Sequence, residues 1–370
     1  MRSMIKSFIL MLGAAVLQMG CSDGTNAVEP DKVETDNRDK WGKVEAATDD
    51  EMIERQRIMD RASAAIKTSD FAALNAMAVD YRSTRALTPS GTWKLTSFYQ
   101  RLEFELTNRD QLSACKNPES QDFLNRWTAF SPKEPTVHIM TSRLNRRIAW
   151  CVRGGAYANK VLDKDMEVFG KLINQTYEQL SDVSAVASKD PEFFVEMIHL
   201  YPNMGASKFE FMGLVNQAMN AEPYYYAIYF EARPYLQEKW LGEAGDLQKF
   251  DDYVTDATKS GAGKGTYARI QWFEMNDKFY SGDPAFHVAV NWPKWKTAMR
   301  DVATQYPNDW NLSKFASFSC TASDYEEARY YFERMKTNIL AAWSSEAAIL
   351  GCKNSTGFKG EVELDRRTSW

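Results

Sequence analysis

Amphipathic stretches with a helical period alternate along the chain with short breaks rich in Pro, Gly and Asp. Phe71, Leu74, Ala78 and Tyr81, for example, recur at the three- and four-residue spacing of one helix face. Strand-like alternation is rare in the sequence, and no run of hairpin turns occurs. The pattern predicts an all-α fold, with helices near residues 51–67, 71–85, 96–106, 122–130, 135–152, 160–186, 191–201, 207–220, 224–239, 267–279 and 311–320.

The clearest helix pair lies near the C-terminus. Ser323, with Glu326 three places on, has the spacing of a capping box and predicts a helix that runs to Ile339 after the helix at 311–320. Repeated helix pairs joined by short turns are typical of a tetratricopeptide-like α-solenoid, in which stacked pairs share one core. Because the period is not strict, the expected repeats are degenerate.

Three stretches carry a family resemblance: RIAWCVRGGAYANKV (147–161), GTYARIQWF (265–273) and YPNDWNLSKFASFSCTASDYEEARYYFERM (306–335). They resemble a bacterial domain of unknown function with a tetratricopeptide-like helical fold. The resemblance covers roughly residues 70–335. It implies a fold and no activity, because the family has no assigned chemistry to transfer.

The N-terminus has the pattern of an export signal. Arg2 and Lys6 precede the apolar segment 8–17, which is too short to span a bilayer. Gly20 before Cys21 resembles the bacterial lipobox, in which the signal is cut before a cysteine that is then lipidated. We therefore expect a signal peptide at 1–20 and a lipid on Cys21. The alternative is an ordinary secretory signal with a chance cysteine.

The rest of the chain divides by composition. Residues 21–48 are polar and short of aromatics, which predicts a flexible tether. A helical-repeat domain is expected at 49–345 and a partly flexible tail at 346–370. Ser22, in place of an Asp after Cys21, favours an outer-membrane anchor. The expected location is the cell envelope, facing the periplasm.

Four cysteines follow Cys21, and an even number in an exported chain predicts disulfides. Of the three possible pairings we favour Cys115–Cys151 and Cys320–Cys352, because each pair is close in sequence. Free buried thiols are the alternative.

Charge and motifs argue against several functions. The net charge of −5 gives no basic face for nucleic acid. The segment TKSGAGKGTYARI (258–270) lacks a phosphate loop, since Thr258 stands where the first Gly is needed and Gly265 where the Ser or Thr is needed. We read Gly261, Gly263 and Gly265 as a flexible loop, and expect no nucleotide.

Candidate catalytic patterns are weak as well. The three histidines are far apart in sequence, and no metalloprotease or nucleophile-elbow motif occurs. The prediction is therefore a non-enzymatic protein without cofactor or metal, a cell-envelope lipoprotein that binds a protein or peptide. Two alternatives remain: an envelope hydrolase acting on peptidoglycan or another glycan, with a paired acid and base, and an envelope immunity protein against a toxin.

One segment combines arginines and aromatics beside a Gly-Gly turn, a combination suited to partner binding. The alternative is that its aromatics are core and the glycines only end a helix. The candidate surface consists of Arg143, Arg147, Trp150, Arg153 and Tyr157.

Overall fold

The computed structural model describes residues 50–107, 115–276, 278–279 and 282–367. Within them the protein is all-α, as the hydrophobic pattern predicts, and its two strands are three residues each. The expected signal peptide, Cys21 and the tether lie outside the described residues. None of the helices in the described part of the chain is both long and apolar enough to cross a membrane.

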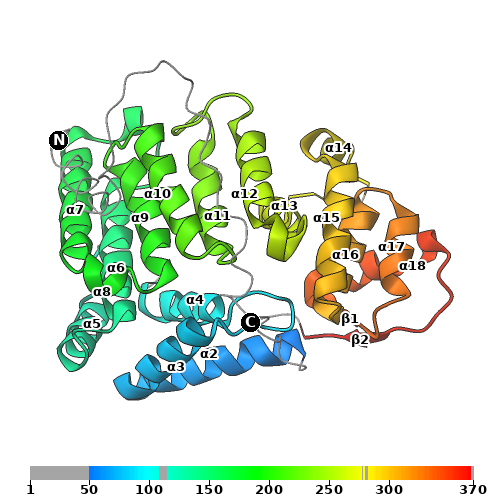
Figure 1. Ribbon diagram of the computed structural model, residues 1–370, viewed down its shortest axis with the longest axis horizontal. Helices are drawn as coiled ribbons and strands as arrows, with labels where there is room; N and C mark the ends of the chain where they lie inside the picture. The colour runs from blue at the N-terminus through cyan, green and yellow to red at the C-terminus, as the bar shows by residue number, and fades with distance from the viewer. Residues whose placement is uncertain (1–49, 108–114, 277, 280–281, 368–370) are drawn as a thin grey trace, which may run out of the picture.

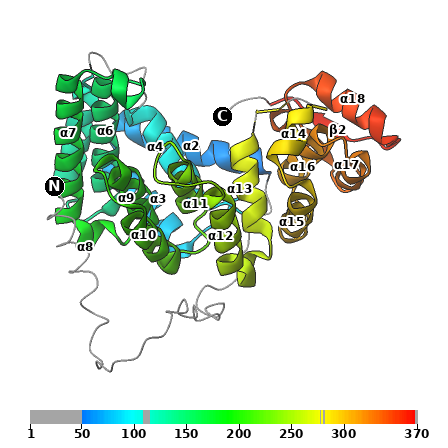
Figure 2. The same cartoon turned by 90° about the horizontal axis from the view of Figure 1, so that it is seen from above.

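The helices follow one another in a row (Figure 1). Helices α2, α3 and α4 run along one side, and α6 to α13 stand beside one another above them, as the view from above confirms (Figure 2). The bounds are α2 Glu51–Thr68, α3 Phe71–Thr84, α4 Lys94–Thr107, α5 Pro118–Phe130, α6 Pro135–Arg153, α7 Asp163–Asp182, α8 Ser184–Ala187, α9 Pro191–Asn203, α10 Lys208–Ala221, α11 Ala227–Ala232, α12 Asp246–Ala262 and α13 Gly265–Met275.

A C-terminal group of helices completes the row. It comprises α14 Pro284–Ala289, α15 Trp292–Gln305, α16 Asp309–Thr321, α17 Tyr325–Phe332 and α18 Glu346–Thr356. Strands β1 (Thr337–Ile339) and β2 (Glu363–Asp365) pair in parallel. Single 3-10 turns occur at η2 (Ala158–Lys160), η3 (Arg233–Leu236) and η4 (Leu340–Ala342).

Most helix starts follow from local capping. The Asp50 carboxylate accepts from the amides of Met52 and Ile53 at the start of α2. Ser207 and Glu210 form a reciprocal capping box at α10. These caps satisfy amides that have no partner inside the helix, so the sequence fixes these boundaries within a few residues.

The predicted helix at 224–239 and the predicted glycine loop differ from the structure. The helix expected at 224–239 is the short α11 followed by η3, where Pro234 cannot donate a helical hydrogen bond. The expected glycine loop is wrong: Gly261 lies in α12 and Gly265 begins α13. Only Gly263 and Lys264 connect the two helices, and the Lys264 amide donates to Asp301 at 2.7 Å.

The C-terminal prediction also needs correction. Asp324, not Ser323, caps α17, and that helix ends at Phe332. The amides of Lys336 and Thr337 donate to the Asp309 carboxylate at 3.0 and 2.9 Å, which draws the chain out of the helix and into β1. The expected tail holds α18 and β2 instead.

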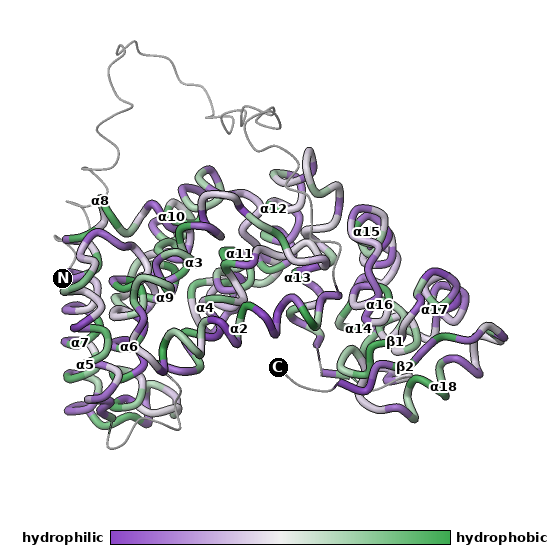
Figure 3. The backbone as a smooth tube through the Cα atoms, turned by 90° about the horizontal axis from the view of Figure 1, so that it is seen from below, coloured by the Kyte–Doolittle hydropathy of each residue, from purple (hydrophilic) through white to green (hydrophobic). Residues whose placement is uncertain are grey.

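Apolar side chains form two large buried clusters. One joins α2 through α13, and the other joins α13 through α18. Both colours of the hydropathy scale recur along the helices, as amphipathic packing requires (Figure 3). A small third cluster, Met52 with Trp310, Ile339 and Ala342, connects α2 to the C-terminal group.

A buried polar loop also joins the two large clusters. Its residue Ser90 is 1% exposed and donates through its amide and hydroxyl to Glu51 at 2.7 and 2.8 Å. The Ser90 carbonyl accepts from Arg269 of α13 at 2.6 Å and from Asn311 of α16 at 3.2 Å. The Pro89 carbonyl accepts from Asn308 at 2.7 Å. We call residues 87–92 the junction loop.

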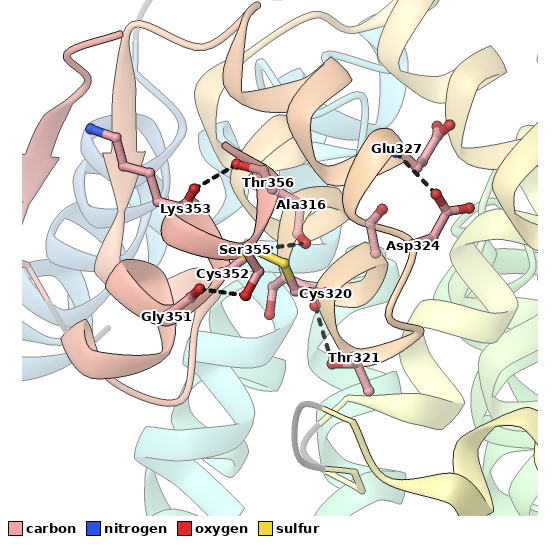
Figure 4. Close-up of a disulfide and its surroundings, with 12 residues drawn as sticks. Ala316, Cys320, Thr321, Asp324, Glu327, Gly351, Cys352, Lys353, Ser355 and Thr356 are labelled. Carbon is pink, nitrogen blue, oxygen red and sulfur yellow. Dashed lines mark hydrogen bonds between the residues drawn. A yellow bond between two sulfur atoms is a disulfide. The ribbon is translucent and has the colours of Figure 1, made fainter. Parts of the chain in front are cut away.

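Both favoured cysteine pairs are bonded. Cys115–Cys151 has a Cα–Cα distance of 5.4 Å, and Cys320–Cys352 one of 5.8 Å. The second bond ties α18 to α16 beside the carbonyl of Ala316 (Figure 4). It therefore holds the predicted tail against the helical core.

Candidate functional site

The predicted surface divides into a buried and an exposed part. Arg143 is 5% exposed and forms ion pairs with three carboxylates: Glu192, Glu103 at 3.4 Å and Glu196 at 3.6 Å. A guanidinium enclosed in this way cannot contact a partner. Its assignment to the binding surface is therefore wrong, because α6 turns it toward α4 and α9 rather than toward solvent.

The buried part extends beyond Arg143. Arg146, the next residue on the same face of α6, makes a bidentate pair with Glu196 at 2.8 and 2.9 Å. Ser142 donates to the same carboxylate at 3.1 Å. Tyr225 of the turn before α11 donates to Glu192, the partner of Arg143.

A second group of charges lies beside the first. Arg82 of α3 donates to Asp190 at 2.7 Å and to Glu134 at 3.1 Å, and Tyr99 donates to Asp190 at 3.0 Å. Each ion therefore has a partner of opposite charge, as buried ions require.

Burial and the neighbouring charges shift the pKa values of the carboxylates in this network. Burial raises the pKa of Asp190 and of Glu192 even though Arg82 and Arg143 oppose it. Burial also acts on Glu103, but there Arg143 and Arg147 outweigh it and lower the pKa to about 2. Because its groups are enclosed and mutually neutralised, we assign this network to the folding of α3, α4, α6 and α9.

The exposed part gathers where α6 ends. The Arg153 guanidinium lies 4.8 Å from the ring of Trp150, a cation–π distance. Its Nη1 donates to the carbonyls of Gly154 and Ala156 at 3.1 and 3.0 Å. Tyr157 is 81% exposed, which excludes the core alternative for that residue. Arg147 lies on the same helix with 40% of its side chain exposed, paired with Glu103.

Trp150 is half-buried and links this surface to a second set of side chains. Its ring lies edge-on to Phe169 at 5.3 Å and to Trp240 at 6.5 Å. Trp240 in turn lies edge-on to Tyr235 at 5.3 Å. The Tyr235 hydroxyl is 3.1 Å from Nδ1 of His199, whose Nε2 is 3.2 Å from Glu231.

Sequence reasoning identifies only part of this second set. The tyrosine-rich stretch EPYYYAIYFEARPYL favours core packing between helices, with a stacking platform for sugars or peptides as the alternative. Tyr225, Tyr226 and Tyr229 are buried, whereas Tyr224 and Tyr235 are half-buried. His199 lies on α9 and Trp240 in the turn after η3, so no short motif contains them. Only the packing of α9 against α11 brings them together.

Neither a metal site nor the pocket on α2 provides a second candidate for the functional site. In the part of the chain that the structure describes, no three His, Cys, Asp or Glu side chains are placed to hold a metal ion. A pocket of about 530 Å³ lies on α2, where Arg57 already pairs with Glu54 and Arg367 with Asp50. Its charges are thus largely neutralised by the chain itself.

Comparison of the chain with models of known families, with curated proteins and with solved structures gives no match. The resemblance to a tetratricopeptide-like domain of unknown function therefore stays a prediction.

Proposed function

We propose that this chain is a non-enzymatic, lipid-anchored scaffold of the cell envelope, and that it binds a protein or peptide partner. The observation that carries the proposal is the stacking of helix pairs in chain order. α6 packs on α7, α9 on α10, α12 on α13 and α15 on α16. The pairs are connected through α7 with α9, through α11, which contacts α9, α10 and α13, and through α13 with α15. This order supports a tetratricopeptide-like α-solenoid of degenerate pairs, an architecture suited to extended partners.

The end of α6 is the proposed contact surface. Tyr157, Arg153 and Trp150 are of the residue types that dominate binding energy at protein interfaces. Arg153 is held by two backbone carbonyls and the Trp150 ring, so little conformational entropy is lost when a partner covers it. Arg147 lies at the rim, where charge guides the approach of a partner more than it adds affinity.

The anchor rests on the sequence. A lipid on Cys21 with a tether to residue 48 gives the domain a reach of at most about 100 Å from the membrane. We propose that the lipid inserts in the outer membrane and that the domain faces the periplasm. Intact mass of the protein from native membranes tests the lipid anchor itself, since an unlipidated, uncleaved chain would refute the anchor.

Site-specific photo-crosslinking in the native envelope tests the contact surface. A photoreactive residue replaces Tyr157 in one variant and Phe209 of α10, which is 87% exposed, in a matched control. We expect one discrete adduct from position 157, abolished by Arg153→Ala together with Trp150→Ala, and none from 209. Equal or absent adducts at both positions would contradict the proposal.

A further inference from the structure

A row of polar side chains begins at Glu231 and ends at Tyr235. Nε2 of His199 lies 3.2 Å from a carboxylate oxygen of Glu231, and Nδ1 lies within hydrogen-bonding distance of the Tyr235 hydroxyl, at 3.1 Å. Both contacts fix the ring, so His199 is a positioning residue that holds the carboxylate and the phenol in place.

The carboxylate at the end of this row can accept further hydrogen bonds. Burial opposes the charge on Glu231, but His199 outweighs it and lowers the pKa, so the group is ionised at neutral pH. Its side chain is 36% exposed, and within the described residues Oε1 has no hydrogen-bond partner. Burial raises the pKa of Tyr235 to about 12, which keeps its hydroxyl protonated.

Two tryptophan rings follow Tyr235 at the other end of this row. Trp240 is 39% exposed and rests edge-on against Tyr235, and Trp150 follows at 6.5 Å from Trp240. We call the set Glu231, His199, Tyr235, Trp240 and Trp150 the Trp240 patch. It offers, side by side, ring surface and a fixed ionised acceptor.

We infer that the Trp240 patch binds a saccharide. Sugar rings present C–H faces that pack on indole and hydroxyl groups that donate to a carboxylate, and the patch supplies both at adjacent positions. Trp240 would pack against the sugar ring, and Glu231 would accept hydrogen bonds from its hydroxyls. Trp150, whose ring already contacts Arg153, would hold Trp240 in place. The residues stand on α6, α9, α11 and η3 and in the turn that follows η3, so regular elements hold most of the patch.

A peptide fits this patch less well. Peptides are bound through an exposed strand edge, an apolar groove or a cluster of free arginines. The elements here are helical, and the two guanidinium groups beside the patch are occupied within the chain. Arg146 pairs with Glu196, and Arg153 donates to the carbonyls of Gly154 and Ala156. The two proposed surfaces share Trp150. The variants that test the saccharide, at Trp240 and Glu231, leave Trp150, Arg153 and Tyr157 unchanged, so the two proposals can fail separately.

Titration calorimetry of the full mature protein tests the inference. The probes are tetrasaccharides of N-acetylglucosamine, glucose and galactose, and glycan strands of peptidoglycan freed of their peptides. We expect saturable binding of at least one probe. Trp240→Ala and Glu231→Gln should each weaken it at least tenfold, and Trp240→Phe, which keeps a ring, should weaken it less than Trp240→Ala.

The matched control is Tyr253→Ala on α12, whose side chain is 40% exposed and which should bind as the wild type does. Should Trp240→Ala fail to fold, Trp240→Phe and Glu231→Gln still decide the question. Absence of binding to every probe, or binding that these variants leave unchanged, would overturn the inference. Tetrapeptides that bind in a Trp240-dependent way while the saccharides do not would also overturn it. The crosslinks at position 157 fail or succeed separately.

Discussion

The Tyr306 ring lies directly against the backbone of Gly91. A Cβ atom at Gly91 would stand 2.6 Å from Cδ2 of Tyr306, and Gly91 has a φ of +82°. The contact joins the junction loop to the C-terminal group of helices. Any side chain at this position must therefore both adopt a left-handed conformation and displace the ring.

We expect Gly91→Ala to lower the free energy of unfolding by about 2–4 kcal/mol, since strain and overpacking add. Urea denaturation at constant m-value measures this loss. Gly205→Ala is the control, because its φ of +79° is similar but no atom lies within 4 Å of the added Cβ. It should cost only about 1 kcal/mol. In a Tyr306→Ala background, Gly91→Ala should cost less than it does alone, and full additivity would refute the steric explanation.

Two arginines of α6 should behave very differently. Arg143→Met leaves the carboxylate of Glu192 buried without its ion-pair partner, so it should cost about 3–5 kcal/mol. Arg147→Met, from a side chain that is 40% exposed, should cost less than about 1 kcal/mol. Thermal unfolding of both variants measures the difference. Similar losses would mean that the two arginines share one environment.

Glu103 should make stability depend on pH in the acid range. Its pKa is lowered from 4.5 to about 2, so its contribution is full above pH 4.5 and is lost as the pH falls through 2. Glu103→Gln should therefore be about 3 kcal/mol less stable than the wild type at pH 7. The difference in the free energy of unfolding between the variant and the wild type should become small as the pH approaches 2.

The raised pKa values of Asp190 and Glu192 act in the opposite direction, because protonation favours their buried state. Both groups are present in wild type and variant, so the difference between the two isolates Glu103. A gap that stays constant from pH 7 to pH 2 would contradict the predicted ionisation.

The two disulfides should each stabilise the fold by about 3–4 kcal/mol, because they close loops of 36 and 32 residues. Replacing Cys320 and Cys352 with Ser, or Cys115 and Cys151, should lower the unfolding temperature accordingly. Reduction should add the mass of four hydrogens to the intact protein. Unchanged mass on reduction would show that the thiols are free.

The sequence predicts the features that depend on neighbouring residues. The helix starts expected at 51, 71 and 207 agree with the structure to within one residue, because the amides that Asp50, Asp70 and Ser207 cap lie within three residues of them. The cysteine pairs were accessible from sequence because each is the nearer of the available choices. The all-α class follows from the period alone.

The errors concern contacts that are distant in sequence. Arg143 was assigned to the surface because its partner Glu192 lies 49 residues away, where no pattern links the two. The end of α17 is determined by Asp309, more than 25 residues upstream. The Trp240 patch is only partly predictable for the same reason. Trp150 and the stretch with Tyr235 stand out in the sequence, but His199 lies 36 residues before Tyr235 and no pattern links the two.

The junction at α2 has a consequence for the order of folding. Met52 packs with Trp310 and Ile339. The junction loop donates to Glu51 through the Ser90 amide and accepts from Asn311 through the Ser90 carbonyl. Helix α2, the first helix of the described residues, thus completes its packing only after almost the whole chain has been made. Ile58, Ala62 and Ala65 can pack against α3 and α4 early, but Met52 at the start of α2 stays uncovered until residues 310–342 arrive.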